Sequence, residues 1–234
     1  MVRCVGIPYK AVAVVVPVRN EARRLPALLR HLQACPGITE LIVVDGGSDD
    51  DSCAVAQALG ARVVLAPRAG RGVQLDLGAR AARAPAVLFV HADTVLPHDA
   101  ARRIAAALAD PRCAGGAFRR RFVPSDWWLA LTTRLGDLRV AFTGISFGDQ
   151  AQFVRRSAYL ASGGFRDLDR AEDMDLARRL RALGQMRLLG PPVRSSARRF
   201  ARGSLGTSLR DAWLTLRLWR QTAPQSCATP ATES

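Results

Sequence analysis

Two strand-like runs that end in acidic residues constrain this chain more than any other feature of its sequence. The apolar run 41–44 leads into four carboxylates between Asp45 and Asp51, and the run 87–90 leads into His91-Ala92-Asp93. Open α/β sheets bind ligands at the edge where such strands end. Because clustered carboxylates repel bare phosphate, we expect them to hold a cation or the polar groups of a nucleoside.

The first half of the chain alternates between strand-like and helix-like segments. Residues 11–18 are continuously apolar and β-branched, which is typical of a parallel strand covered on both faces. A helix follows, with one apolar face formed by Leu25, Leu28, Leu29 and Leu32. Further strands are expected at 39–45, 62–66 and 86–91, and further helices at 50–59, 72–83 and 98–109. This alternation predicts an α/β fold with a Rossmann-like, mostly parallel sheet flanked by helices.

After residue 112 the alternation stops, and we expect a mixed C-terminal part. The expected elements are strands at 115–123, 145–155 and 186–189, the last ending before Pro191-Pro192, and helices at 174–183 and 204–221. We find no internal repeat and no clear linker. We therefore expect one domain over 1–221, with a nucleotide-binding half at 11–110, an acceptor half at 111–221 and a disordered tail at 222–234.

Charge and cysteine content narrow the partners and the compartment. The formal net charge is +14, but the arginines are scattered along the chain, so we expect no nucleic-acid partner. The excess charge still favours nucleotide diphosphates or an acidic membrane surface. The five cysteines contain no Cys-x-x-Cys pair, which indicates a reducing, cytoplasmic compartment. Because the longest early apolar run cannot span a bilayer, we expect a protein that is soluble or lies on the inner face of the cell membrane.

The loops after the first two strands are open to two interpretations. Pro17 stops strand pairing and brings Asn20 and Glu21 to the start of the first helix, within reach of a ligand at the sheet edge. Asn20 would equally serve as a simple helix cap. Likewise, Asp45-Gly46 either contacts a ligand or forms a polar turn that caps the next helix.

Four motifs, in this order and spacing, resemble the family-2 glycosyltransferases of the GT-A fold. They are Val-Pro-Val-Arg-Asn-Glu, Val-Asp-Gly-Gly-Ser-Asp-Asp, His-Ala-Asp and Glu-Asp, within roughly residues 11–200. Gly70-Arg71-Gly72-Val73-Gln74, His91-Ala92-Asp93-Thr94 and Gly148-Asp149-Gln150 are further similar to a bacterial subgroup labelled for arsenosugar biosynthesis or diaponeurosporenoate-type glycosyl transfer. The resemblance implies an inverting enzyme that moves a hexose from a nucleotide-diphosphate sugar, with UDP as the expected nucleotide, to a small or lipid-like acceptor.

The resemblance also implies where the donor binds. Asp45 would accept hydrogen bonds from uracil, and Pro17, Asn20, Glu21 and Gly46 would line the same pocket. Arg71, placed between two glycines, would approach the diphosphate with its fork of donors. The alternative for Arg71 is an ordinary solvated arginine.

The metal motif of the family is Asp-x-Asp, and this chain departs from it with His91-Ala92-Asp93. Alternate residues share one face of a strand, so His91 and Asp93 are the expected ligands of a magnesium or manganese ion. Asp93 would touch the ion directly. His91 is either a ligand, a group that orients the ribose, or a histidine satisfied at a strand end.

Glu172-Asp173 matches the base motif of the family. Asp173 is the candidate base that takes a proton from the acceptor, with Glu172 as its support. The alternative is that two acids simply favour a helix N-terminus. Asp149 and Gln150 fall where related enzymes contact the acceptor or the donor sugar. The central expectation is that Asp45, Asp93 and Asp173 gather at one cleft.

Three other functions remain open from the residues. A sugar-nucleotide pyrophosphorylase shares the alternating layout, but it would place a glycine-rich loop directly after the first strand. A basic α/β protein that binds nucleic acid would explain the charge but not the ordered acids. The segments starting at Trp127 and at 204 are amphipathic, so they either pack on the sheet or make peripheral contact with a membrane surface.

Overall fold

The computed structural model describes residues 11–168 and 171–197. Its strands are β1 Val12–Val18, β2 Ile38–Asp45, β3 Arg62–Leu65, β4 Ala86–Phe89, β5 Thr94–Val95, β6 Cys113–Val123, β7 Phe153–Arg155 and β8 Gln185–Ser196. Its helices are α1 Leu25–Gln33, α2 Ser52–Ala58, α3 Arg71–Ala81, α4 Ala100–Leu108, α5 Trp127–Thr143, α6 Arg156–Ala161 and α7 Glu172–Leu183, with a 3₁₀ turn at Gly148–Gln150. The expected helix at 204–221 and the tail at 222–234 lie outside the described residues.

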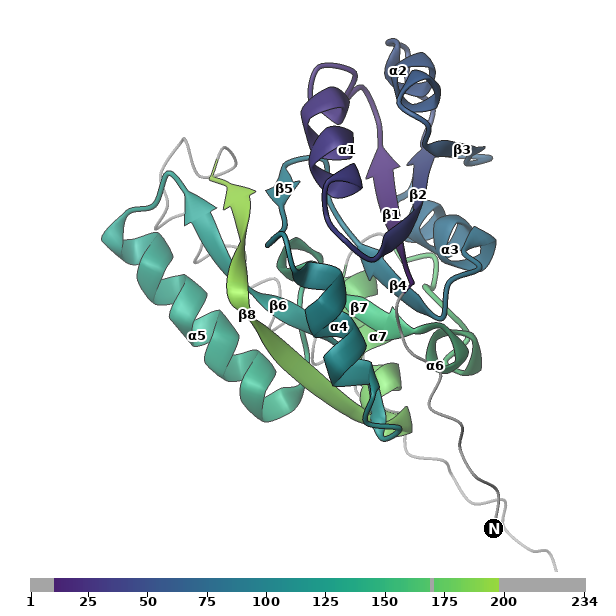
Figure 1. Ribbon diagram of the computed structural model, residues 1–234. Helices are drawn as coiled ribbons and strands as arrows, with labels where there is room; N and C mark the ends of the chain where they lie inside the picture. Colours follow the sequence, from purple (N-terminus) through teal and green to yellow (C-terminus); the bar gives the residue numbers. More distant parts are fainter. Residues whose placement is uncertain (1–10, 169–170, 198–234) are drawn as a thin grey trace, which may run out of the picture.

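All the described strands join one mixed sheet (Figure 1). The strand order is β3-β2-β1-β4-β7-β6-β8-β5. Pairs β1–β2, β1–β4, β2–β3 and β6–β8 are parallel, whereas β7 runs antiparallel to both β4 and β6, and β5 runs antiparallel to β8. The predicted α/β class, with helices on a mostly parallel sheet and a mixed C-terminal part, is confirmed.

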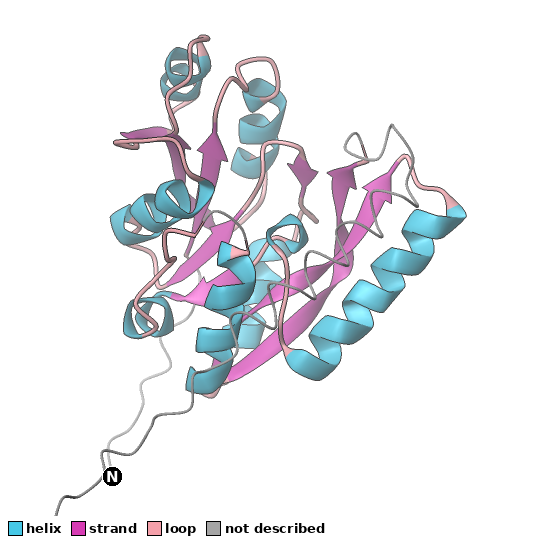
Figure 2. Cartoon of the chain, turned by 180° about the vertical axis from the view of Figure 1, so that it is seen from behind, coloured by secondary structure: helices cyan, strands magenta, loops and turns pink. Residues whose placement is uncertain are grey.

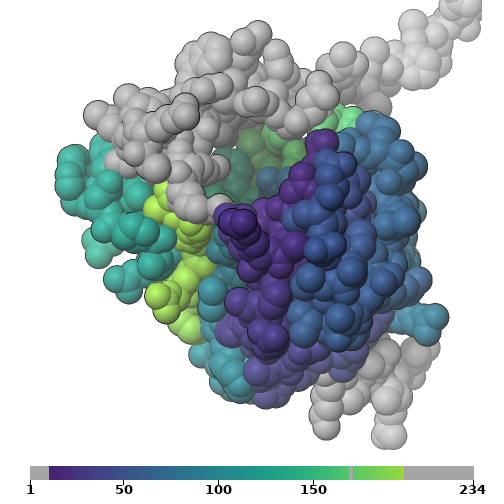
Figure 3. Space-filling model, turned by 90° about the horizontal axis from the view of Figure 1, so that it is seen from above, coloured from purple at the N-terminus to yellow at the C-terminus, as the bar shows by residue number. Residues whose placement is uncertain are grey.

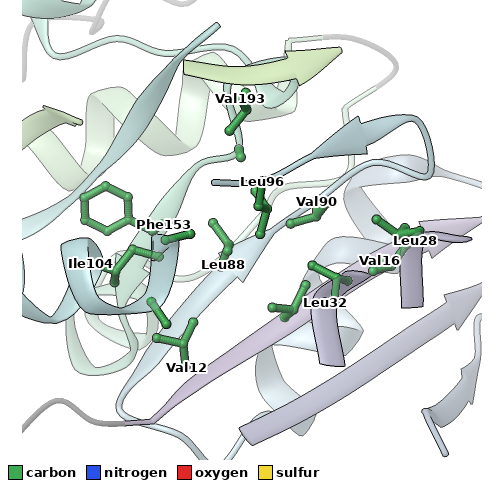
Figure 4. Packing of buried hydrophobic residues seen from close by; sticks show 14 of the residues in the cluster. Val12, Val16, Leu28, Leu32, Leu88, Val90, Leu96, Ile104, Phe153 and Val193 are labelled. Atoms are coloured by element: carbon green, nitrogen blue, oxygen red, sulfur yellow. The ribbon is translucent and has the colours of Figure 1, made fainter. Parts of the chain in front are cut away.

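The sheet is covered on both faces, which explains the continuous apolar run of β1. Val12, Val14 and Val16 face one core, which includes the predicted leucine face of α1 and residues of α4 (Figure 4). Ala13 and Val15 face the opposite core, which includes residues of α3 and α7. A strand buried on both sides cannot show the polar alternation of a one-sided strand.

Two expectations for the second half are wrong. Residues 145–155 do not form one long strand: Gly144, with φ of 71°, ends α5, a 3₁₀ turn follows, and only Phe153–Arg155 pairs with the sheet. The strand expected to stop before Pro191-Pro192 instead continues to Ser196. Its register against β6 jumps from Phe118–Leu189 to Arg120–Val193, so a bulge accommodates both prolines without breaking the strand.

Helix α5 is the longest helix of the described chain, and it forms where the amphipathic stretch at Trp127 predicts it. The Asp126 side chain caps its start by accepting from Leu129 N at 2.7 Å. It packs along β6 and β8 at the outer edge of the molecule, as both Figure 1 and the opposite view in Figure 2 show. Among the described residues, no helix combines the length and the apolar character needed to cross a bilayer.

Candidate active site

A cleft of about 850 Å³ lies at the edge where β1 and β4 end. One wall comes from the end of β1, the start of α3 and the loop after β4, and the other from the ends of β6 and β8, the 3₁₀ turn and the start of α7. Figure 3 shows these N-terminal segments, in purple and blue, beside the teal and yellow-green C-terminal ones. The volume suits a ligand larger than a single monosaccharide.

The first residues of α3 bring a cationic group and a helix N-terminus to the cleft. Gly70 precedes the helix with φ of 157°, a conformation that favours glycine. A Cβ on Gly72 would lie 2.8 Å from the backbone oxygen of Arg166, so this position also requires glycine. Arg71 follows Gly70 and lines the cleft. Free backbone N–H groups and a guanidinium together make this end of α3 suited to an anion such as a diphosphate.

Gln74 fixes α3 to the sheet. Its buried Nε2 donates to Val18 O at 2.9 Å and to Val44 O at 2.8 Å, at the ends of β1 and β2. The side chain also lies against Gly46, where a Cβ would approach it to 2.9 Å. The position of Arg71, one turn earlier, is therefore set by hydrogen bonds to two strand ends.

Glu172 and Asp173 meet Arg71 at the start of α7. Arg71 Nε lies 3.3 Å from Glu172 Oε1, and Arg71 Nη2 lies 3.7 Å from Asp173 Oδ2. Asp173 also accepts from Gly148 N at 2.5 Å and from Met174 N at 2.8 Å. Both acids are buried in the protein yet line the cleft, so the predicted pair lies where a ligand can reach it.

Burial raises the pKa of Glu172 above its usual value of 4.5. The nearby Arg71 lowers this pKa and the charge of Asp173 raises it, and the net effect is upward. A proton is held more readily on Glu172 than on an ordinary glutamate.

His91 and Asp93 also line the cleft. His91 Nε2 lies 2.6 Å from Arg71 Nη2. Arginine is only a donor, so in this contact Nε2 is the acceptor. Within the described ranges, no group of three or more His, Cys, Asp or Glu residues is placed to hold a metal ion. Any ion beside Asp93 would therefore need oxygen atoms from the substrate, which is how magnesium usually binds.

Asp45 is placed differently from Asp93 and Asp173. It is 4% exposed and, within the described part of the chain, is not among the residues lining the cleft. Its Oδ2 accepts from Gly47 N at 2.9 Å and Ser48 N at 3.0 Å, and Oδ1 accepts from the Ser48 hydroxyl. Burial raises the pKa of Asp45, but these hydrogen bonds outweigh it and leave the pKa below the ordinary value.

Asn20 ties this loop to the loop after β1. Asn20 N donates to Ser48 Oγ at 2.9 Å, and its Oδ1 accepts from Asp49 N at 2.8 Å. The residue has φ of 58°, which asparagine tolerates better than most. Pro17 and Glu21 line the cleft, whereas Asn20 and Gly46 are not among its described lining residues and join the two loops, Gly46 by donating its N–H to Val18 O at 3.0 Å.

Of the two predicted acceptor-binding residues, Asp149 and Gln150, one lines the cleft and the other supports a loop. Asp149 lines the cleft and forms an ion pair with the nearly buried Arg120. Gln150 is buried, and its Oε1 accepts from Phe147 N at 3.1 Å, so it supports the turn. Beneath this turn the Arg139 guanidinium stacks on Phe147 at 3.7 Å from the ring centroid. Burial and the neighbouring Arg120 lower the pKa of Arg139 to about 10.

Several cleft residues are not identified by the sequence patterns. Phe122, Phe147, Asp167 and Ser195 line the cleft, yet none belongs to a motif that the sequence analysis identifies, whereas Gly148 lines the cleft and belongs to the Gly148-Asp149-Gln150 motif. Gly148 contributes through its backbone N–H to Asp173. A Cβ at Gly148 would lie 1.8 Å from Arg71 Nη2 and 3.0 Å from His91 Nε2, so a larger residue here would displace the Arg71 guanidinium. For Gly148, the signal in the sequence is the Gly148-Asp149-Gln150 motif.

Comparison with protein-family models gives one match that covers most of the chain. Residues 13–166 match the model described as Glycosyl transferase family 2. An uncharacterized glycosyltransferase of Mycobacterium tuberculosis strain H37Rv is 43% identical over 83 residues, which is 36% of this chain and 37% of the relative. An undecaprenyl-phosphate 4-deoxy-4-formamido-L-arabinose transferase of Pseudomonas savastanoi pv. phaseolicola is 28% identical over 161 residues, 63% of this chain and 47% of that protein.

A 4,4'-diaponeurosporenoate glycosyltransferase of Staphylococcus haemolyticus is also similar, with 38% identity over 58 residues, 25% of this chain and 16% of the relative. The chain thus spans less than half the length of these curated relatives.

Solved structures share the fold. S. aureus TarS residues 1–349 in complex with UDP-GlcNAc superposes with a TM-score of 0.64 at 17% identity, covering 80% of this chain and 58% of that one. The mannosyltransferase PcManGT from Pyrobaculum calidifontis, in complex with GDP-Man and Mn²⁺, superposes with a TM-score of 0.61 at 25% identity, covering 79% and 56%.

Proposed function

Because this chain belongs to glycosyl transferase family 2 and has the GT-A fold, we propose that it transfers a hexose from a nucleotide-diphosphate sugar to a small or lipid-like acceptor, with inversion at the anomeric carbon. The observation that carries the proposal is the convergence of Asp93, Arg71 and Asp173 on one cleft. Family membership also separates this function from the pyrophosphorylase and the nucleic-acid-binding alternatives, neither of which accounts for the match over residues 13–166. The free thiols at Cys35, Cys53 and Cys113 support a cytoplasmic reaction.

We assign the donor to the wall formed by β1 and α3. Arg71 and the N–H groups at the start of α3 would meet the diphosphate, and the loops carrying Asp45 and Glu21 would meet the base. Support for uridine comes from the UDP-GlcNAc complex of S. aureus TarS, whereas PcManGT takes GDP-Man. The loop at Asp45 is rigid through its own hydrogen bonds, which suits it to select one base.

A divalent cation fits the residues present. Asp93 supplies a carboxylate, and His91 lies beside it at the cleft, with Nε2 engaged by Arg71. One carboxylate combined with phosphate oxygens is a common environment for magnesium or manganese. The ion would supply neutralisation of the charge on the leaving diphosphate. Arg71 contributes the same kind of stabilisation from the protein itself.

Asp173 would act on the opposite side of the donor sugar. The acceptor oxygen attacks the anomeric carbon, a new C–O bond forms, the bond to the diphosphate breaks, and the acceptor proton passes to Asp173. Hydrogen bonds from Gly148 N and Met174 N hold the carboxylate in place for this role. Where the acceptor is an ionised phosphate or carboxylate, no proton is removed and Asp173 matters less. Relatives named for undecaprenyl phosphate and diaponeurosporenoate support acceptors of that kind.

A thermal-shift screen tests the donor assignment. Wild-type protein is heated with UDP, GDP, UDP-glucose, UDP-GlcNAc or GDP-mannose, with and without manganese. Saturation at about 100 times Kd stabilises by roughly 2.7 kcal/mol, which raises Tm by about 5–11 °C for a chain of this size. Asp93→Asn should lose the manganese-dependent part of the shift, while the control Asp99→Asn, at the residue that precedes α4, should keep it. No shift with any nucleotide, with or without the ion, would refute the assignment.

A further inference from the structure

Helix α5 carries a row of large apolar side chains that face solvent. Trp127, Leu131, Leu135, Leu138 and Phe142, here called the α5 stripe, are all exposed, with Trp127 at 76% and Phe142 at 81%. At about 100° per residue, the fifteen positions from first to last make four turns plus about 60°, so the side chains follow one side of the helix. Scattered exposed apolar residues are common, but a continuous row along a whole helix is not.

The opposite side of α5 packs on the protein, and its buried residues are Leu129, Thr133 and Val140. Leu129 packs with Phe122 and Ala197 at the ends of β6 and β8. An amphipathic helix normally turns its apolar side toward the protein, whereas in α5 a row of large apolar side chains faces solvent. Here one side packs on the sheet, and Figures 1 and 2 show no other described element beyond α5. The stripe is therefore a surface built for a second contact.

The charged residues on and beside α5 indicate which kind of partner the stripe contacts. The exposed residues of α5 include a single charged side chain, Arg134, and it is positive. Arg119 and Arg121 on the adjacent β6 are also exposed, and the whole chain carries +14. Pairing two copies through this face would bring like charges together, which is unfavourable. An anionic lipid surface offers both an apolar interior for the stripe and negative headgroups for the arginines.

We propose that the α5 stripe docks this protein on an anionic membrane surface, with α5 lying in the plane of the interface. Trp127 stands at one end of the stripe, and tryptophan prefers the headgroup region. That end adjoins the cleft, because Phe122 and Ser196 line it and Phe122 packs with Leu129 of α5. Docking would thus bring the acceptor side of the cleft near the bilayer. This last consequence rests on the proposed transferase function, whereas the docking itself does not.

Vesicle flotation tests the docking. Full-length protein is mixed with phosphatidylcholine vesicles that contain or lack phosphatidylglycerol. We expect wild type to float with the anionic vesicles, less with neutral ones, and less at high salt. Leu135→Glu/Leu138→Glu should lower the partition coefficient by about tenfold or more. The matched control is Leu65→Glu, a 70% exposed leucine on β3 at the opposite end of the sheet, which should bind within about twofold of wild type.

Other outcomes identify other occupants. If wild type stays at the bottom of the gradient and light scattering shows a dimer that the double variant converts to a monomer, the stripe joins two copies and the proposal is wrong. If wild type stays at the bottom as a monomer and the double variant lowers Tm well below that of Leu65→Glu, residues 198–234 cover the stripe, and the proposal is again wrong. Nucleotide thermal shifts measured on the same variants report on the transferase proposal separately.

Discussion

Replacing Asp173 by asparagine is the most direct test of the proposed base. In the folded protein Asp173 accepts two backbone hydrogen bonds, from Gly148 N at 2.5 Å and from Met174 N at 2.8 Å. Both bonds need an acceptor. Asparagine offers one carbonyl oxygen and one NH₂ group, so one of the two backbone N–H groups would face a donor.

The substitution should have two separate effects, one on the rate of turnover and one on the stability of the fold. Loss of a general base lowers turnover by about 10²–10⁴, equivalent to about 2.7–5.4 kcal/mol in the activation free energy. The unsatisfied N–H costs about 1–3 kcal/mol in the free energy of unfolding. At about 2–4 °C for each kcal/mol, the fall in Tm is modest and the protein stays folded at assay temperature.

The assay measures release of the nucleotide diphosphate with the first hydroxyl acceptor that supports turnover in a panel of sugars and polyprenols. Asp175→Asn is the matched control. Asp175 lies in the same helical turn and is also buried, but it pairs with Arg179 at 2.6 Å and is not among the cleft residues of the described structure. The Asp175→Asn variant should be less stable than wild type, yet its turnover rate should stay within about threefold of the wild-type rate. If Asp173→Asn transferred sugar to a hydroxyl at more than about a tenth of the wild-type rate, Asp173 would not be the base.

The remaining predictions concern stability. Gln74→Met should lower the free energy of unfolding by about 1–3 kcal/mol in urea titrations, because Val18 O and Val44 O each lose a hydrogen bond; an unchanged midpoint would contradict the bracing role. Glu172 has a raised pKa, so the folded state holds its proton more tightly than the unfolded chain does. Its contribution to stability is present below pH 4.5 and is lost as the pH rises through the folded pKa. Glu172→Gln should flatten that part of the curve of urea midpoint against pH, and an identical curve would show that burial of Glu172 is unimportant.

The first half of the fold could be predicted because its signals are local. The β-branched run of β1 and the four leucines of α1 each identify an element whose burial the structure confirms. The acidic residues that follow β2 and β4 could be assigned to a ligand site, because open sheets bind ligands at the carboxyl ends of their strands. These inferences need only the neighbouring residues along the chain.

The second half depends on contacts between distant residues. Residues 145–155 have a strand-like pattern, but Gly148 N is used by Asp173 and Gln152 Nε2 donates to Ser146 O at 3.0 Å, so the segment folds into a turn. β8 passes Pro191-Pro192 because its partner β6 allows a bulge there. Neither partner is visible from local sequence.

In the candidate site, too, some features could be predicted from local sequence and others depend on how the chain folds. The types of residue at the cleft were predictable, but whether an acid faces ligand or its own loop was not. Asp45 and Asp93 both follow buried strands, yet Asp45 is enclosed by Ser48 and Gly47 whereas Asp93 lines the cleft. That difference comes from the short turn after β2, where Gly47 adopts a φ of 85°.

The close seating of α3 on the sheet affects how the cleft would respond to ligand. A Cβ on Gly78 would lie 2.3 Å from Val15 and 2.9 Å from Val44, so only glycine allows this contact, and Gln74 secures the same helix one turn earlier. The backbone that carries Arg71 is thus preorganised before substrate arrives. Little conformational entropy is then lost when an anion binds, so more of the interaction energy remains for affinity and for rejecting ligands of the wrong shape.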